Sequence, residues 1–323
     1  MSNKEEAENE EYERLKNSKF KQQKLPGWRP VPTITSTTII FFCFGGVFIV
    51  LGIIILIFSN KIEEVSYRYD EECKNQLKEK NECVITLDIK KKMEKKIMIY
   101  YQLNGFYQNH RRYVKSKSDD QLNGKNIQLA EMKDSQDCDP AITNKDMNQN
   151  ISISGKPLLP NDLAIPCGLI AKSYFNDNFT NWIYINSFNE EVPFNPNEKD
   201  IAWKADKELK YKNIDPDKQW IDMEDEHFIV WMRPAALPNF RKLWGRIKQD
   251  LDKGNYILNV ISENCNVSSF DGKKFFILSE VNKFGGNNKF LGICYIIVGG
   301  VSIILSIVFI IGFKMHQKKE KEV

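Results

Sequence analysis

Two long runs of apolar residues near the ends of the chain dominate its hydropathy pattern. They extend from Ile39 to Phe58 and from Phe290 to Phe313, and neither contains a charged side chain. Each has the roughly 20 residues that an α-helix needs to cross a bilayer. A signal peptide has an apolar stretch of only about 7 to 15 residues close to the N-terminus. The pattern therefore predicts two transmembrane helices, within residues 34–58 and 290–313.

The basic residues flanking these spans predict their orientation. Lysines and arginines gather on the outer side of both spans, at Lys16, Lys19, Lys21, Lys24, Arg29, Lys314, Lys318, Lys319 and Lys321. Such residues favour the cytosolic side. We expect cytosolic tails over residues 1–33 and 314–323, and a lumenal or extracellular region over residues 59–289.

The region between the spans has the pattern of a β-rich domain with some helix. Short runs rich in β-branched and aromatic residues predict strands at 95–103, 182–188, 227–232, 255–261 and 273–281, which would suit a β-sandwich. One helix is predicted, because Phe240, Leu243, Trp244 and Ile247 fall at helical spacing and Gly254 follows as a stop. The Asn- and Pro-rich tracts at 139–162 and 189–217 are expected to be long surface loops.

Composition weakens one interpretation of the segment Phe-Tyr-Gln-Asn-His-Arg-Arg-Tyr-Val-Lys-Ser at residues 106–116. Its arginines and aromatic rings could hold single-stranded nucleic acid. The chain nevertheless carries 46 basic against 43 acidic residues, and the segment is expected on the exoplasmic side. We expect Phe106, His110 and Tyr113 to form a helical packing stripe, with Arg111 and Arg112 facing carboxylates of the same domain or of a partner. An acidic lipid headgroup is the alternative.

Five of the seven cysteines, Cys73, Cys83, Cys138, Cys167 and Cys265, lie in the region between the spans. An oxidising compartment favours disulfides among them, although spacing alone leaves the pairing open. Three sequons at Asn150, Asn178 and Asn266 are candidate glycosylation sites on the same side.

Motifs for catalysis or metal binding do not emerge from the sequence. The three histidines lack HxxxH or CxxC spacing, and neither a GxSxG nor a GxxxxGK[ST] motif occurs. The acidic run from Asp222 to His227 lacks the pattern of a calcium loop and is expected to cap a following strand. We expect no catalytic residue, no cofactor and no metal.

Three classes of function remain from the residues alone. The chain could be a subunit or chaperone of a larger membrane complex, a subunit of a two-span ligand-gated ion channel, or a membrane-anchored ectoenzyme. A channel would need polar or charged residues in the spans. The spans instead contain small or weakly polar residues such as Gly299, Gly300, Ser302 and Ser306, which favour docking against the helices of a partner.

Several long segments resemble the Cdc50/Lem3 family, the β-subunits of P4-type ATPase phospholipid flippases. They are residues 20–30, 106–124, 166–177, 227–247 and 284–300, in the order of the family. The sequence departs from the family pattern at Lys172, where the family has asparagine. It departs again at Asp271-Gly272-Lys273-Lys274, where the family has Gly-Gly-Thr-Lys-Ser.

The resemblance implies a membrane protein with two transmembrane helices, cytosolic termini, and a glycosylated exoplasmic domain built as an antiparallel β-sandwich plus short helices. It implies disulfides Cys73–Cys83 and Cys138–Cys167, with Cys265 as a free thiol. The implied partner is a P4-type ATPase α-subunit in a heterodimer, with membrane phospholipids as its substrate and no nucleic acid. The implied location is the ER, the Golgi or endosomes, or the plasma membrane.

Two segments are expected to bind this partner. The first is the basic stretch before the first span, expected as an extended arm along the cytosolic face because its prolines disfavour a helix. The second is the segment around the paired arginines. The candidate partner-binding residues are Phe20, Lys21, Gln22, Gln23, Leu25, Pro26, Trp28, Phe106, Tyr107, Arg111 and Arg112.

Overall fold

The computed structural model describes residues 12–24, 33–74, 76, 80–94, 96–185, 190–262, 272–282 and 285–321. The chain divides into two compact units, and each is considered by itself. The helical unit comprises residues 1–54 and 290–323, and the β-domain comprises residues 55–289.

Two long helices form the helical unit, α2 (Ile34–Asn60) and α11 (Lys289–Lys321). Both are long and apolar enough to cross a bilayer. They pack side by side through ring contacts such as Phe41 with Phe309 at 5.9 Å and Phe48 with Tyr295 at 5.6 Å between centroids. Most of their remaining apolar side chains are exposed, as in helices that face lipid.

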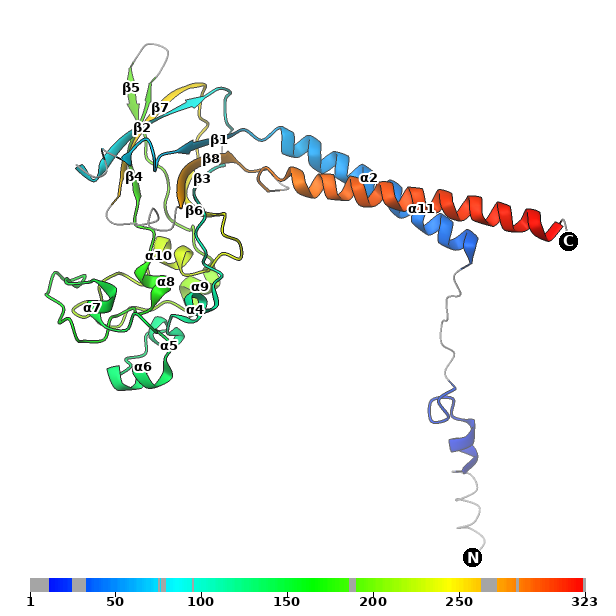
Figure 1. The fold of residues 1–323 in the computed structure, drawn as a ribbon, viewed down its shortest axis with the longest axis horizontal. Helices are drawn as coiled ribbons and strands as arrows, with labels where there is room; N and C mark the ends of the chain where they lie inside the picture. Colours follow the sequence, from blue (N-terminus) through cyan, green and yellow to red (C-terminus); the bar gives the residue numbers. More distant parts are fainter. Residues whose placement is uncertain are drawn as a thin grey trace, which may run out of the picture. The chain divides into compact units, whose positions relative to one another are not determined.

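Two antiparallel sheets form the centre of the β-domain (Figure 1). The first has the order β1 (Glu64–Arg68), β8 (Lys273–Glu280), β3 (Ile97–Asn104) and β6 (Phe240–Ile247). The second has the order β2 (Glu82–Ile89), β7 (Gly254–Ile261), β4 (Asn178–Ile185) and β5 (Glu191–Pro193). The strand runs predicted at 95–103, 255–261 and 273–281 correspond to β3, β7 and β8. The run at 182–188 overlaps β4, and its last three residues lie outside the described part of the chain.

The two sheets pack face to face through their apolar sides. Alternate residues of β2 and β3 are buried, which is the period expected of half-buried strands. Phe179 of β4 contacts Trp244 of β6 at 5.1 Å and Phe276 of β8 at 4.8 Å between ring centroids, so the core joins one sheet to the other. The predicted antiparallel sandwich is confirmed.

Short helices occupy the connections between strands and gather beyond one end of the sheets (Figure 1). Five lie between β3 and β4: α4 (Arg111–Lys115), α5 (Asp119–Leu122), α6 (Leu129–Ser135), α7 (Asn144–Met147) and α8 (Leu169–Lys172). Two more, α9 (Lys204–Leu209) and α10 (Glu226–Trp231), lie between β5 and β6. The tracts expected to be loops therefore contain α7, β5 and α9.

The helix predicted at residues 240–247 is wrong, because this segment is strand β6. Its pairing with β3 shifts register between Ile99 and Tyr100, so that Trp244 is an extra residue on β6. A bulge of this kind changes which face the following residues occupy. Phe240, Trp244 and Ile247 are all buried as a result, and this spacing imitates the period of a helix.

The strand predicted at residues 227–232 is also wrong, because it forms α10. The side chain of Asp225 accepts a hydrogen bond from the backbone N–H of Phe228, which caps the helix N-terminus. Phe228, Ile229 and Trp231 are buried on its inner side. A short apolar run does not distinguish a buried helix from a buried strand, and the acidic residues before it cap a helix and not a strand.

Candidate partner-binding surfaces

The loop that leads into α4 is fastened to the loop that precedes β6. The backbone N–H of Phe106 donates to the carbonyl of Pro238 at 3.1 Å, and the side chain of Asn109 donates to the carbonyl of Ala236 at 2.9 Å. Gln108 is completely buried, and its Oε1 accepts the N–H of Ala235 at 2.9 Å. These bonds tie residues 105–110 to residues 234–239.

Phe106 anchors this pair of loops in the core. Its ring is 7% exposed and lies 6.0 Å from the ring of Tyr113 and 5.8 Å from that of Trp231. The expected stripe is thus only partly formed, since Phe106 and Tyr113 meet but His110 is exposed and precedes the helix. Phe106 supports the surface from beneath and is not itself available to a partner.

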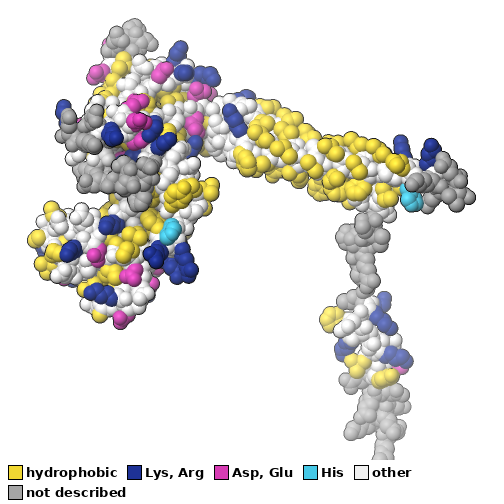
Figure 2. Space-filling model, viewed as in Figure 1, with side chains coloured by type: hydrophobic (Ala, Val, Ile, Leu, Met, Phe, Trp, Pro, Cys, Tyr) yellow, Lys and Arg dark blue, Asp and Glu magenta, His cyan; other side chains and the backbone are white. Residues whose placement is uncertain are grey.

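Four side chains project from the anchored loops and form what we call the Tyr107 surface: Tyr107, Arg111, Arg112 and Leu237. Tyr107 is 63% and Leu237 is 67% exposed. Neither arginine side chain forms an ion pair or hydrogen bond with any residue that the structure describes, so the expectation of carboxylate partners in the same domain is not met there. Figure 2 shows basic side chains beside a histidine over the α4 region, with apolar side chains next to them.

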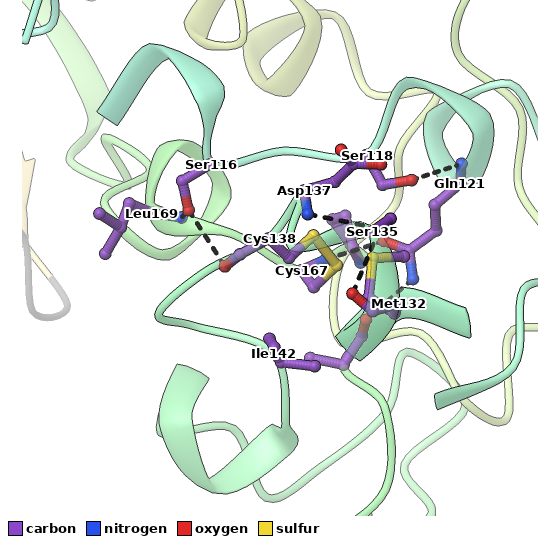
Figure 3. Close-up of a disulfide and its surroundings, with 12 residues drawn as sticks. Ser116, Ser118, Gln121, Met132, Ser135, Asp137, Cys138, Ile142, Cys167 and Leu169 are labelled. Carbon is purple, nitrogen blue, oxygen red and sulfur yellow. Dashed lines mark hydrogen bonds between the residues drawn. A yellow bond between two sulfur atoms is a disulfide. The ribbon is translucent and has the colours of Figure 1, made fainter. Parts of the chain in front are cut away.

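The disulfide between Cys138 and Cys167 fixes α4 from its C-terminal side (Figure 3). Ser116, the residue after α4, donates from Oγ to the carbonyl of Cys138 at 3.1 Å and accepts the N–H of Leu169 at 2.8 Å. The Oε1 of Gln121 accepts the N–H of Cys167 at 2.9 Å. A rigid backbone therefore continues from the disulfide to the two arginines.

Gly168 makes this arrangement possible. It has a φ of +102°, and a Cβ built on it would lie 2.2 Å from the carbonyl oxygen of Ser116. Any larger residue would push α4 away from the disulfide.

The second disulfide joins Cys73 to Cys83, with 5.6 Å between Cα atoms. It connects the segment after β1 to β2, and so links the two sheets. The two bonds are the pairs that the sequence resemblance implies, whereas Cys265 lies outside the described residues.

Comparison with known proteins decides the family. A profile described as the LEM3 (ligand-effect modulator 3) family / CDC50 family matches residues 55–319. The chain belongs to the CDC50/LEM3 family. Putative ALA-interacting subunit 2 of Arabidopsis thaliana is 40% identical, over 94% of this chain and 88% of its own length. Cell cycle control protein 50A of Mus musculus is 37% identical, over 91% and 88%. Cell cycle control protein 50B of Homo sapiens is 30% identical, over 95% of each.

As a CDC50-family member, the chain is a two-span membrane protein, and its spans pack through glycines. A Cβ built on Gly45 would lie 2.9 Å from the carbonyl oxygen of Gly299, and one built on Gly299 would lie 2.8 Å from that of Gly45. Gly52 approaches Gly292 in the same way, at 2.8 Å. Of the glycine pair expected to dock a partner, Gly299 therefore serves the contact between the two spans, and Gly300 has open space around it.

The N-terminal segment of this CDC50-family chain is described from residue 12 to residue 24. Residues 12–17 are helical and residues 19–23 form a turn. The part before Leu25 is therefore not the extended arm that the sequence predicted. Among the described residues its hydrogen bonds stay within the segment, for example from the Gln22 side chain to the Leu15 carbonyl at 3.1 Å. The ring of Phe20 is 76% exposed, and Lys21 and Gln23 are exposed as well. Leu25, Pro26 and Trp28 lie outside the described residues.

Two of the three sequons can be placed. Asn150 and Asn178 have exposed side chains, the second at the first residue of β4. Asn266 lies outside the described residues.

Carboxylates of the acidic run at residues 222–227 accept hydrogen bonds from other residues of the β-domain. Asp222 accepts from the side chain of Asn213 at 2.7 Å, and Glu226 accepts from the ammonium of Lys207 at 2.6 Å. The hydrogen bond from Lys207 and those from the N–H groups of Ala202 and Asp200 outweigh the effect of burial, so that the pKa of Glu226 is lowered. These carboxylates organise the loops between β5 and β6.

Proposed function

We propose that this chain is the non-catalytic accessory (β) subunit of a P4-type ATPase lipid flippase. Membership of the CDC50 family supports the proposal, as do relatives named ALA-interacting subunits. The observation that carries it is the Tyr107 surface, which presents two arginines that form no ion pair with any described residue, and two exposed apolar side chains, on a rigid backbone. Arginine and tyrosine on such a support are typical of the centres of protein interfaces.

The arrangement in the membrane follows from the basic flanks of the spans. Both tails lie in the cytosol, and the β-domain lies on the exoplasmic side of the ER, Golgi, endosomal or plasma membrane. Asn150 and Asn178 are then accessible to glycosylation, and the disulfides lie in an oxidising compartment.

The chain acts by binding and not by chemistry. The β-domain contacts the exoplasmic loops of the ATPase through the Tyr107 surface, while α2 and α11 pack beside its membrane domain. A subunit that binds the folded ATPase more tightly than its unfolded chain stabilises it by mass action, which supports its folding and exit from the ER. Preferential binding to particular conformations also shifts their populations during transport from the exoplasmic to the cytosolic leaflet.

The N-terminal segment supplies a second contact on the cytosolic side. Phe20, Lys21, Gln22 and Gln23 present an exposed ring, a charge and amides before the first span, and Leu25, Pro26 and Trp28 continue the segment. Deletion of residues 1–30 is expected to reduce both co-purification of the ATPase and transport. Unchanged binding and transport would show that this segment is a solvated tail.

The test of the whole proposal is co-expression with each P4-type ATPase of the source organism. Delivery of the ATPase from the ER and its lipid-stimulated ATP hydrolysis are measured with and without this chain. Both are expected to depend on the chain for at least one ATPase, and the purified chain alone is expected to hydrolyse no ATP. Equal delivery and activity in every pair would exclude the proposal.

A further inference from the structure

A cavity of about 620 Å³ lies among the short helices of the β-domain. It is lined by residues from three stretches: 117–123 around α5, 206–211 at the end of α9, and 232–234 after α10. Leu122 and Met232 belong to its apolar lining, and charged side chains come from all three stretches. Ligand sites in proteins have volumes of about 300 to 1,000 Å³ and combine apolar contacts with a few polar groups. The cavity therefore has the size and the lining of a small-molecule site.

Tyr211 brings a hydrogen-bond donor to this cavity. The residue is only 6% exposed, and its ring packs edge-on against Phe228 with 6.4 Å between centroids. Its hydroxyl forms no hydrogen bond with any residue that the structure describes. Burial raises the pKa of this hydroxyl, with smaller contributions from the carboxylates of Asp206 and Asp119, so it keeps its proton. Since buried polar groups are usually hydrogen-bonded, the hydroxyl is available to a ligand in the cavity.

Arg233 is the second group of the lining that has donors to spare, and three contacts hold it in place. Its Nε donates to the buried carboxylate of Asp206, and its guanidinium lies over the ring of Trp203, 4.9 Å from the centroid. Its backbone carbonyl accepts a hydrogen bond from the ammonium of Lys242 at 2.7 Å, and Lys242 is itself 7% exposed. Neither amino group of Arg233 bonds to a residue that the structure describes. The amino groups of a fixed guanidinium match the two oxygens of a carboxylate or a phosphate.

The charges of the lining leave an excess of one positive charge. The ammonium of Lys117 contacts Asp119 at 2.5 Å, and that of Lys210 contacts Asp206 at 3.0 Å. Together with Arg233, the lining carries three cations against two carboxylates, which gives a net charge of +1 at neutral pH. Solvent reaches the cavity, because the side chains of Lys210 and Arg233 are 61% and 48% exposed. The excess charge and the spare donors favour a ligand that carries one negative charge.

We propose that this cavity, which we call the Arg233 cavity, binds the monoanionic group of a small molecule, either a carboxylate or a phosphodiester. The hydroxyl of Tyr211 and the amino groups of Arg233 donate to the oxygens of this group, while Lys117 and Lys210 add electrostatic attraction. Binding gives the buried hydroxyl a partner and neutralises the excess charge. The inference concerns the β-domain by itself and does not depend on the partner proposed above.

The experiment uses the full-length chain in detergent micelles with isotope-labelled methionine methyl groups. Met232 lines the cavity, so its methyl NMR signal, assigned with Met232→Leu, reports binding there. Benzoate is the probe for a carboxylate and glycerophosphoglycerol the probe for a phosphodiester, with benzyltrimethylammonium as a cationic control. At least one anion should shift the Met232 signal to saturation within about 10 mM, and the cation should not. The anion with the lower Kd identifies the class of the ligand.

Substitutions in the lining should change the Kd of that anion in opposite directions. Tyr211→Phe removes only the hydroxyl and should raise the Kd about tenfold, because a hydrogen bond to a charged group is lost. Lys117→Gln removes the excess charge and should raise the Kd at least about threefold, whereas Asp119→Asn increases that charge and should lower the Kd by a similar factor. The matched control Tyr256→Phe removes the hydroxyl of a buried tyrosine in β7 and should keep the Kd of the wild type.

Three results would overturn the proposal. The first is that neither anion saturates the Met232 signal. The second is an equal Kd for the wild type and Tyr211→Phe, because the anion would then bind without the hydroxyl. The third is weaker binding by Asp119→Asn, which tests the sign of the charge effect at a side chain that is 74% exposed and not needed for the core. Circular dichroism and the unfolding midpoint verify that each variant is folded.

Discussion

The ammonium of Lys274 lies 2.8 Å from Oδ2 of Asp177, and both side chains are buried, with 8% and 0% of their areas exposed. The hydroxyl of Tyr69 donates to the same oxygen at 2.6 Å, and Ser262 donates to Oδ1. The pair joins β8 to the residue before β4, in the opposite sheet. Each of these two buried charges is stabilised by the other, because neither is solvated by water.

Replacing Lys274 should therefore lower the stability of the fold, and the adjacent Lys273 provides a matched control. Lys274→Met leaves the carboxylate of Asp177 buried without its cation, which should reduce the free energy of unfolding by about 3 to 5 kcal/mol. Lys273 is exposed, so Lys273→Met should change the free energy of unfolding by no more than about 0.5 kcal/mol. Denaturant unfolding of both variants measures the difference. Similar values for the two would show that the pair is energetically unimportant.

Asp206 makes the stability of the β-domain sensitive to acid. Its hydrogen bond with Arg233, assisted by Lys210 at 3.0 Å, lowers the pKa of this carboxyl below its ordinary value. The unfolded chain then binds more protons than the folded one between the lowered pKa and the unfolded value of about 3.9. The stabilisation is complete above the unfolded pKa and is lost as pH falls through the folded one.

Asp206→Asn should accordingly reduce stability at neutral pH and weaken the loss of stability below about pH 4. The free energy of unfolding, measured from pH 7 to pH 2 for the wild type and the variant, tests this. Parallel curves over the acid range would contradict the assignment to Asp206.

The two disulfides should contribute unequally to stability. The chain-entropy relation gives about 4 kcal/mol for Cys138–Cys167, which closes the longer loop, and about 3 kcal/mol for Cys73–Cys83. Cys138→Ser/Cys167→Ser should also release α4 and weaken binding through the Tyr107 surface. Unfolding midpoints and ATPase co-purification of the two double-serine variants are compared. A larger loss for Cys73→Ser/Cys83→Ser in both assays would refute the ranking.

Reversing the charges of the Tyr107 surface should affect the partner and not the fold. Arg111→Glu/Arg112→Glu should weaken association with the ATPase at least about tenfold, or about 1.4 kcal/mol. The unfolding midpoint should remain unchanged, since neither side chain bonds to the described residues. Lys133→Glu/Lys145→Glu, on α6 and α7, makes the same change of charge elsewhere and should bind normally. Equal binding of the ATPase by the two variants would show that the Tyr107 surface is not part of the interface.

Adjacent glycines in α11 should respond differently to the same substitution. Gly299→Leu places a side chain where a Cβ already meets the Gly45 carbonyl at 2.8 Å, so it should separate the two spans. Gly300→Leu meets open space and should leave them together. Cross-linking of cysteines introduced on facing positions of α2 and α11 reports the contact. If both variants cross-link as well as the wild type, the glycine contact does not hold the pair.

Sequence reasoning succeeded where a single physical requirement fixes the pattern. The spans needed only length and lack of charge, and β3, β7 and β8 were predicted from their β-branched and aromatic residues alone. It failed at β6, because one extra residue at Trp244 changed the period of burial. It failed at α10 because the cap on Asp225 is a local signal, whereas the apolar run that follows fits either element.

The candidate surface was identified only in part from the sequence. Arg111, Arg112 and Tyr107 were found through their residue types and the family resemblance. Leu237 was missed, because its place beside Tyr107 results from hydrogen bonds between loops more than a hundred residues apart. The burial of Lys274 beside an exposed Lys273 likewise depends on the opposite sheet and has no local signal.

The pairing of β1 with β8 has a consequence for biosynthesis. These strands are the first and last that the structure describes in the β-domain, and β8 also pairs with β3 in the middle of its sheet. Almost the whole domain must therefore be synthesised before this sheet can be completed. Until then, the edges of β1 and β3 that pair with β8 are unpaired. The chain is then exposed to aggregation and to chaperones for most of its synthesis. A chain truncated before residue 273 would lack β8, so the edges of β1 and β3 that pair with it would stay open.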